Sequence, residues 1–220
     1  MIWPDAIEAF DTLPLAERLF VRARAFSAPL EALAHRVTGR DVLDVGCGHG
    51  VLVAMLAHRS PERRVTGIDP DPRKIEWARR SVGRWPNVTL ELASIEQVPV
   101  SAFDSICIAD VLYLLPPDAW RSFFTAAHEA LRPGGRLLLK EAEDDGSWRA
   151  SKALWQERLM VSLLRRTHSS GAIAVPRREV MLEALLAAGF VLDDVVPLAQ
   201  GFTTPHVLFV AHKSMRPGAI

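Results

Sequence analysis

The sequence is poor in the features that mark several large functional classes. Its 26 basic and 26 acidic residues cancel, so no excess positive charge is present to attract a nucleic-acid backbone. Its two cysteines, Cys47 and Cys107, are too few for a disulfide framework or a cysteine metal site, and we expect no bound metal. No apolar run approaches the ~20 residues of a membrane span, and the acidic opening MIWPDAIEAFD does not resemble a signal peptide. We therefore expect a cytoplasmic protein with no membrane span and no nucleic-acid partner.

What the sequence does contain is a regular alternation of strand-like and helix-like segments. The strand-like segments are 41–45, 64–69, 88–93, 103–110, 135–140, 190–198 and 206–211. Helices are expected between them, beginning at Asp71, near Asp118 and near Arg177. Such an alternation predicts an α/β fold, in which helices cover both faces of a mostly parallel sheet.

The first strand-like segment runs into a glycine-rich turn, DVLDVGCGHG, from Asp41 to Gly50. Glycines at 46, 48 and 50 allow positive φ angles and let a ligand approach the backbone closely. A nicotinamide-binding turn needs a further glycine three residues after the second one, where this chain has Val51. Instead, Asp44 precedes the turn and Asp69 ends the next strand, where a carboxylate can accept hydrogen bonds from both ribose hydroxyls.

With these residues in view, the chain resembles the class I S-adenosylmethionine-dependent methyltransferases of the small-molecule type. The resembling motifs are DVGCGHG, VTGIDPDP, FDSICIADVLYLLP and LRPGGRLLLKE, and the tail AAGFVLDDVVP…HVLFVAHK is compatible with them. The resemblance covers about residues 41–139. It implies a Rossmann-like, seven-stranded, mostly parallel sheet with an antiparallel last strand, and S-adenosyl-L-methionine as the cofactor.

The resemblance also implies cofactor contacts at the ends of successive strands. These are Asp44, Gly46, Cys47 and Gly48 for the methionine half, Asp69 and Pro70 for the ribose and adenine, Ser94 and Ile95 for the adenine, and Asp110 for the amino end or the substrate. Ser94 departs from the family pattern, which often has an acidic residue there. For Asp69 and Asp110, the alternative is an ordinary capping role.

Methyl transfer needs little help from side chains, because in-line positioning in a dry pocket contributes ~7–11 kcal/mol. We therefore expect a mechanism based mainly on positioning and desolvation. The candidates for a general base are Glu141 beyond the fifth strand, Tyr113 beyond the fourth, His168 and His49. For Glu141 the alternative is a loop carboxylate that opposes Lys140, and His49 is better placed to touch the cofactor.

We divide the chain into an N-terminal helical extension (1–40), a methyltransferase domain (41–213) with a lid-like insertion at about 142–175, and a flexible tail (214–220). Two helices are expected in the extension, with Arg22 and Arg24 on solvated faces or toward an anion. The insertion carries an apolar stripe: Trp148, Trp155, Leu159 and Leu163. The stripe packs on its own domain, forms a homodimer contact, or acts as a lid over the methyl acceptor.

The lid interpretation implies a small, mostly apolar metabolite or a lipid-like intermediate as the acceptor. Nucleic acid is disfavoured, because ADVLYLLPP follows the fourth strand in place of the Asn/Asp-Pro-Pro-Tyr motif of amino-directed nucleic-acid methylases. Two alternatives from other classes remain at this point, a nicotinamide-dependent oxidoreductase and a non-catalytic S-adenosylmethionine-binding protein.

Overall fold

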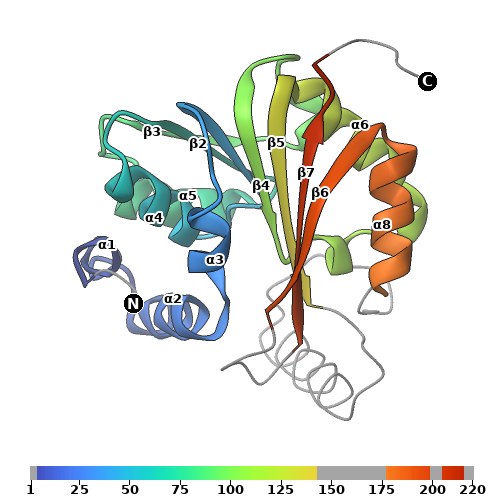
Figure 1. Ribbon diagram of the computed structural model, residues 1–220. Coiled ribbons are helices and arrows are strands. Elements are labelled where there is room, and N and C mark those ends of the chain that lie inside the picture. Colours follow the sequence, from blue (N-terminus) through green and yellow to red (C-terminus); the bar gives the residue numbers. More distant parts are fainter. Residues whose placement is uncertain (1–3, 143–176, 199–204, 216–220) are drawn as a thin grey trace.

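The computed structural model describes residues 4–142, 177–198 and 205–215. Within these residues one seven-stranded sheet has the order β3-β2-β1-β4-β5-β7-β6 (Figure 1). Its strands are β1 (Asp41–Val45), β2 (Arg64–Asp69), β3 (Val88–Leu92), β4 (Phe103–Ala109), β5 (Leu131–Ala142), β6 (Phe190–Pro197) and β7 (His206–Lys213). β1 to β5 run parallel, and β7 lies antiparallel between β5 and β6. This topology confirms the predicted fold class.

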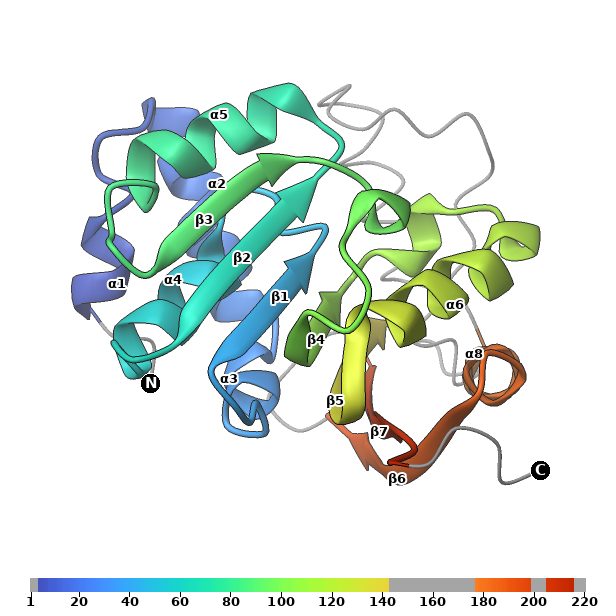
Figure 2. The ribbon, with the colours of Figure 1, turned by 90° about the horizontal axis from the view of Figure 1, so that it is seen from above.

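Helices cover both faces of the sheet (Figures 1 and 2). One apolar core includes residues of α1 (Pro4–Glu8), α2 (Leu15–Ser27), α3 (Leu30–Ala34), α4 (Val51–Arg59) and α5 (Pro72–Ser81). A second core includes residues of α6 (Trp120–Ala130) and α8 (Arg178–Ala187). Three single-turn 3₁₀ helices complete the described elements: η1 (Ile95–Gln97), η2 (Leu112–Leu114) and η3 (Pro117–Ala119). None of the helices described combines the length and apolar character that a bilayer crossing requires.

Local sequence signals explain why several element boundaries could be predicted. In β1, residues 42–45 are all buried, as expected for a central parallel strand covered on both faces. At the start of α5, the Asp71 side chain accepts a hydrogen bond from the backbone N–H of Arg73 at 2.9 Å, and Pro72 occupies the first turn. The predicted apolar face of this helix, Ile75, Ala78 and Val82, is buried.

Two expectations about boundaries need correction. The helix expected near Asp118 begins as the 3₁₀ turn η3, and α6 starts only at Trp120. The fifth strand is longer than the predicted 135–140 at both ends. It begins at Leu131, which pairs with Phe103 of β4, and β7 pairs with it as far as Glu141↔Val207 and Ala142↔His206. Glu141 is therefore a strand residue and not a loop carboxylate.

The N-terminal segment forms three short helices rather than the expected two, since α1 was not anticipated. Phe10, Val21 and Leu33 are at most 2% exposed and belong to the same core as α4. The N-terminal extension therefore packs on the same side of the sheet as α4, the helix that follows β1. The predicted insertion beyond Ala142, with His168 and its apolar stripe, and most of the predicted tail lie outside the described residues.

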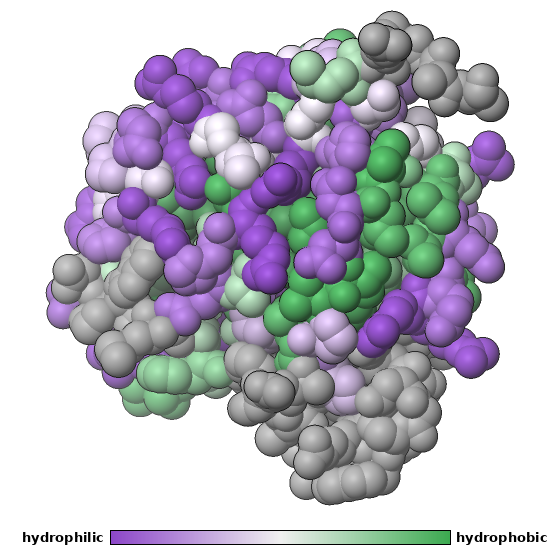
Figure 3. Space-filling view, in the orientation of Figure 1, coloured by the Kyte–Doolittle hydropathy of each residue, from purple (hydrophilic) through white to green (hydrophobic). Residues whose placement is uncertain are grey.

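Polar residues cover much of the face shown in Figure 3, and hydrophobic ones gather near β6 and α8. The large apolar side chains that these elements expose are Val180, Leu186 and Val191. The expected homodimer stays a prediction.

Candidate active site

The carboxyl ends of the parallel strands bring charged side chains to one edge of the sheet. This edge is where open α/β sheets bind their ligands. Asp44 lies on β1, Asp69 ends β2, Asp110 follows β4, and Lys140 and Glu141 are near the end of β5. All five are at most 8% exposed, so their charges must be balanced by neighbours or suppressed by protonation.

The glycine turn after β1 is held by Asp69 of the neighbouring strand. Gly46 and Gly48 have φ angles of +71° and +56°, which favour glycine. The backbone N–H of Gly48 donates to Oδ2 of Asp69 at 2.9 Å, and the N–H of Asp71 donates to Oδ1 at 2.8 Å. A Cβ placed on Gly48 would meet no atom of the described residues within 4 Å, so this part of the structure leaves the backbone of the turn open to a ligand.

Asp44 lies beneath this turn and carries an unsatisfied oxygen. Its side chain is 2% exposed, and Oδ2 has no hydrogen-bond partner among the described residues. Burial raises the pKa of Asp44 to about 8; the positive charge of Arg24 opposes the rise, and the negative charge of Asp69 adds to it. A buried acceptor without a donor is costly in a folded protein, so Asp44 is suited to receive a positively charged hydrogen-bond donor.

Asp110 is already bound to two cations. Nζ of Lys140 lies 2.6 Å from both carboxylate oxygens, and Nη2 of Arg24 lies 2.8 Å from Oδ2. Arg24 also donates to the backbone carbonyl of Ala109 at 3.2 Å. The expectation that Arg24 lies on a solvated face is therefore wrong: only Arg22 does, and it pairs with the exposed Asp11.

Glu141 does not lie at an open rim. It is fully buried, and its Oε1 accepts hydrogen bonds from the backbone N–H groups of Val111 at 2.7 Å and Leu112 at 2.9 Å. Burial raises the pKa of Glu141 to about 8, the negative charge of Asp110 adds to the rise, and the two backbone donors oppose it. In this position Glu141 fixes a turn and is shielded from any acceptor molecule in solution.

The other predicted base candidates differ in their surroundings. His49, in the glycine turn, has Nε2 at 2.9 Å from Oε2 of Glu17 on α2, and its ring lies 5.1 Å from that of Phe20. His49 therefore connects the turn to the N-terminal helix. Tyr113 lies in η2 and is half-buried. His168 is outside the described residues.

The remaining predicted cofactor residues lie near the ends of β1, β2 and β3. Cys47 is buried in the turn, and its backbone N–H donates to the carbonyl of Ile68 at 2.9 Å. Pro70 is exposed directly after Asp69. Ser94 is the N-cap residue of η1, and its backbone N–H donates to Oε1 of Gln97 at 2.9 Å. Ile95 is 2% exposed, and its side chain lies in the core on the α6 side of the sheet. Their contacts with a cofactor stay a prediction.

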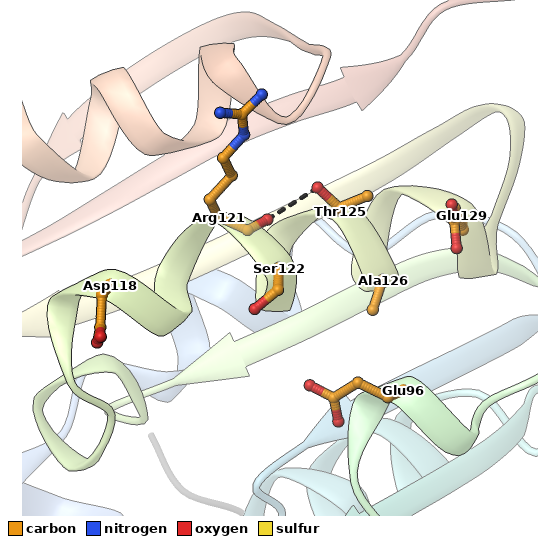
Figure 4. Close-up of a pocket in the computed structure, with 7 residues that line it drawn as sticks. All are labelled: Glu96, Asp118, Arg121, Ser122, Thr125, Ala126 and Glu129. Carbon is orange, nitrogen blue, oxygen red and sulfur yellow. Dashed lines mark hydrogen bonds between the residues drawn. The ribbon is translucent and has the colours of Figure 1, made fainter.

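A surface pocket of about 490 Å³ lies elsewhere, between η1 and α6 (Figure 4). Glu96 of η1 faces Ser122 and Ala126 of α6 across it, while Arg121 points away. None of the predicted site residues lines this pocket. In the described parts of the chain, no group of three or more histidine, cysteine or acidic side chains is arranged to hold a metal ion.

Sequence reasoning missed the roles of Arg24, Lys140 and Glu17. The helical spacing of Val21, Ala25 and Ala28 could have indicated the position of Arg24. These three residues are apolar and buried, and Arg24 lies beside the face of α2 that they form. Lys140 follows three leucines in a strand-like segment. A lysine in such a buried position needs a partner of opposite charge, which predicts an ion pair. No local pattern identified Glu17 as the partner of His49.

Comparisons with known proteins show what this chain is similar to. Residues 42–135 match the methyltransferase domain family. An uncharacterized 37.1 kDa protein in transposon TN4556 of Streptomyces fradiae is 32% identical over 204 residues, which cover 90% of this chain and 56% of that protein. Demethylmenaquinone methyltransferase of Tropheryma whipplei is 36% identical over 104 residues, 47% of this chain and 42% of the relative. The chain thus spans about half the length of these relatives.

Among solved structures, the Burkholderia thailandensis 1,6-didemethyltoxoflavin-N1-methyltransferase has the same fold. Its structure, with bound 1,6-didemethyltoxoflavin and S-adenosylhomocysteine, superposes with a TM-score of 0.67 at 22% sequence identity. The match covers 96% of this chain and 86% of that one.

Proposed function

We propose that this chain is a class I S-adenosylmethionine-dependent methyltransferase, that its cofactor is S-adenosylmethionine, and that it methylates a small, mostly apolar acceptor. The observation that carries the proposal is the arrangement of Asp44, Gly48 and Asp69 at the ends of β1 and β2. In the part of the chain that the structure describes, an acceptor oxygen without a donor, an open glycine backbone and a ribose-compatible carboxylate lie together there.

The residues at this edge fit the two ends of the cofactor. Its amino-acid end is a zwitterion, and Oδ2 of Asp44 can accept from an ammonium group while Arg24, whose charge acts on Asp44, can attract a carboxylate. Each oxygen of Asp69 accepts one backbone N–H and keeps acceptor capacity for a ribose hydroxyl. Asp110 is less suited to bind the cofactor itself, because Lys140 and Arg24 already bind its carboxylate.

When bound, the cofactor supplies a methyl group activated on a sulfonium. The protein's contribution is then to hold an acceptor in line with that group and to exclude water, which favours positioning over acid–base catalysis. The burial of Glu141 and its two backbone hydrogen bonds support a mechanism without this residue as the base. Tyr113 and His168 stay as candidates for an acceptor that arrives protonated.

The acceptor class is proposed from the relatives and the sequence. The two methyltransferases described above are named for demethylmenaquinone and 1,6-didemethyltoxoflavin, neither of which is a macromolecule. The balanced charge of the chain also argues against a polyanionic acceptor. Both observations support a small molecule, and the apolar stripe of the predicted insertion supports an apolar one.

Isothermal titration calorimetry on the full chain tests the cofactor assignment. We expect the protein to bind S-adenosylhomocysteine and to bind NADH much more weakly, and we expect Asp44→Ala to weaken S-adenosylhomocysteine binding. Asp118→Ala, which alters an exposed carboxylate on η3, serves as the matched control and should bind like the wild type. Folded wild-type protein that gives no heat with either S-adenosylmethionine or S-adenosylhomocysteine would overturn the assignment.

Catalysis requires a separate screen. S-adenosylhomocysteine release would be measured with phenols, carboxylic acids, amines and lipid precursors as acceptors. Turnover confined to apolar small molecules supports the proposed acceptor class, whereas turnover with polar acids or amines alone contradicts it.

A further inference from the structure

Two successive residues of β5 hold the turn that follows β4. The backbone carbonyl of Lys140 accepts from the N–H of Asp110 at 2.9 Å, and its ammonium binds the Asp110 carboxylate. The carboxylate of Glu141 receives the next two backbone N–H groups, those of Val111 and Leu112. Thus Lys140 and Glu141 of β5 hold the three consecutive residues 110–112 that follow β4.

The backbone conformation of this turn depends on those contacts. Asp110 has a φ angle of +58°, in the left-handed region that costs a non-glycine residue energy and that persists when surrounding contacts enforce it. Val111 follows in a right-handed conformation, with φ −116° and ψ −36°. A left-handed and a right-handed residue in succession aim neighbouring N–H groups at one point, and Oε1 of Glu141 occupies that point.

The same turn contacts the glycine turn after β1. A Cβ placed on Gly46 would lie 2.6 Å from Cγ2 of Val111, so the Val111 side chain lies directly against the Gly46 backbone. Val111 is largely shielded from solvent, at 9% exposure, and Gly46 is partly exposed. The position of Val111 therefore limits the path that the glycine turn can take.

We propose that Glu141 is a positioning residue for cofactor binding: it holds the amides of Val111 and Leu112 so that Val111 keeps the glycine turn in its binding shape. This inference rests on the proposed function, since the turn is assigned to S-adenosylmethionine. It gives Glu141 a role in cofactor affinity and none in proton transfer.

Substitutions at Glu141 separate the two roles. Glutamine keeps a carbonyl oxygen at the position that the two backbone N–H groups address, but it cannot act as a base. Burial raises the pKa of Glu141 to about 8, which favours the protonated carboxyl at neutral pH, so the amide N–H₂ of glutamine takes the place of a hydroxyl. We expect Glu141→Gln to bind S-adenosylhomocysteine within about threefold of the wild type, and Glu141→Ala to bind about tenfold or more weakly, the effect of losing one to two hydrogen bonds.

Val111→Ala tests whether the effect passes through the proposed contact. It removes the methyl groups that lie against Gly46 and should also weaken S-adenosylhomocysteine binding. In a double-mutant cycle, Glu141→Ala/Val111→Ala should bind no more weakly than the weaker single variant, because both changes break one connection. Affinities would be measured by calorimetry, and folding by circular dichroism, with Asp118→Ala as the control.

The outcomes discriminate between the possibilities. A folded Glu141→Ala variant with unchanged affinity overturns the inference, and so does a Glu141→Gln variant that binds normally but loses turnover. Additive losses in the cycle also overturn it. If Glu141→Ala does not fold, the decision rests on Val111→Ala: lost affinity beside a normal Glu141→Gln supports the inference, and normal affinity contradicts it. A wild type that binds no S-adenosylhomocysteine overturns the proposed function together with this inference.

Discussion

Nζ of Lys140 lies 2.6 Å from both carboxylate oxygens of Asp110, in a part of the protein that solvent barely reaches. Burial alone would raise the pKa of Asp110, but the charges of Lys140 and Arg24 hold it well below its usual value. Burial likewise lowers the pKa of Lys140, and the charge of Asp110 opposes this. The pair connects the ends of β4 and β5 and so fixes the edge of the sheet that carries the site.

Replacing Lys140 by methionine should destabilise the protein by about 3–5 kcal/mol, because it removes one partner of a buried ion pair. Arg24 would then be the remaining cation on Asp110 in the described structure. Urea denaturation measures the change. The double variant Lys140→Met/Asp110→Asn, in which the buried charge is also removed, should recover part of the loss; no recovery would mean that packing of the lysine stem dominates.

Asp69→Ala should weaken S-adenosylhomocysteine binding about tenfold to a hundredfold, the range of a lost charge-assisted hydrogen bond. Because Asp69 also holds the N–H groups of Gly48 and Asp71, we expect a lower thermal midpoint as well. Asp69→Asn retains one acceptor oxygen, so its affinity for S-adenosylhomocysteine and its thermal midpoint should both fall less than those of Asp69→Ala. Calorimetry and thermal unfolding would be compared for the two variants, and unchanged affinity in Asp69→Ala would place the ribose contact elsewhere.

Glu17→Ala should loosen helix α2. The contact between Oε2 of Glu17 and Nε2 of His49 joins this helix to the glycine turn, and both side chains are largely buried, at 16% and 9% exposure. Hydrogen exchange of the α2 amides should become faster, while exchange in β4 and β5 stays unchanged. Glu17→Gln, which can still hydrogen-bond to His49, is the matched control, and α2 exchange in Glu17→Ala as slow as in the wild type would show that this contact does not hold α2.

Stability should fall as the pH rises from about 6.5 to about 8. Burial raises the pKa values of Asp44 and Glu141 to about 8 in the folded protein, above their ordinary values near 4, so the folded state binds more protons in this interval and loses that advantage as they dissociate. Below pH 6.5 the trend is opposed by His206, whose folded pKa burial lowers to about 4. Each proton contributes up to about 1.4 kcal/mol per pH unit.

Urea denaturation at pH 6.5 and pH 8 measures this dependence. The double variant Asp44→Asn/Glu141→Gln has no titrating carboxyl at either position and should show a flatter profile than the wild type. A wild-type profile that rises over the same interval would contradict the assignment of these two carboxyls as neutral.

Much of the fold follows from local patterns. The ends of β1 and β2 were predictable because the strand-like segments DVLDV and RVTGID stop at Val45 and Asp69, where a glycine turn and a proline follow. The helix after Asp71 was predictable from its capping residue. The end of β5 was not, because it depends on pairing with β7, a segment far along the chain.

The site was predictable in its residue types and less so in their roles. Asp44 was identified from its position before the glycines and Asp69 from its place at the end of the next strand, and both lie at the carboxyl edge of the sheet. The pairing of Asp110 with Lys140 and Arg24, and that of Glu141 with the 111–112 amides, arise from tertiary packing. A sequence shows that a buried carboxylate needs a partner, but not which of several partners it has.

The antiparallel insertion of β7 between β5 and β6 has a consequence for biosynthesis. On the ribosome, residues 131–142 emerge well before 206–213, so the growing chain carries an unpaired, apolar strand edge for the whole interval. Such edges invite pairing with other chains. We therefore expect a nascent or prematurely terminated chain that lacks residues 206–213 to aggregate.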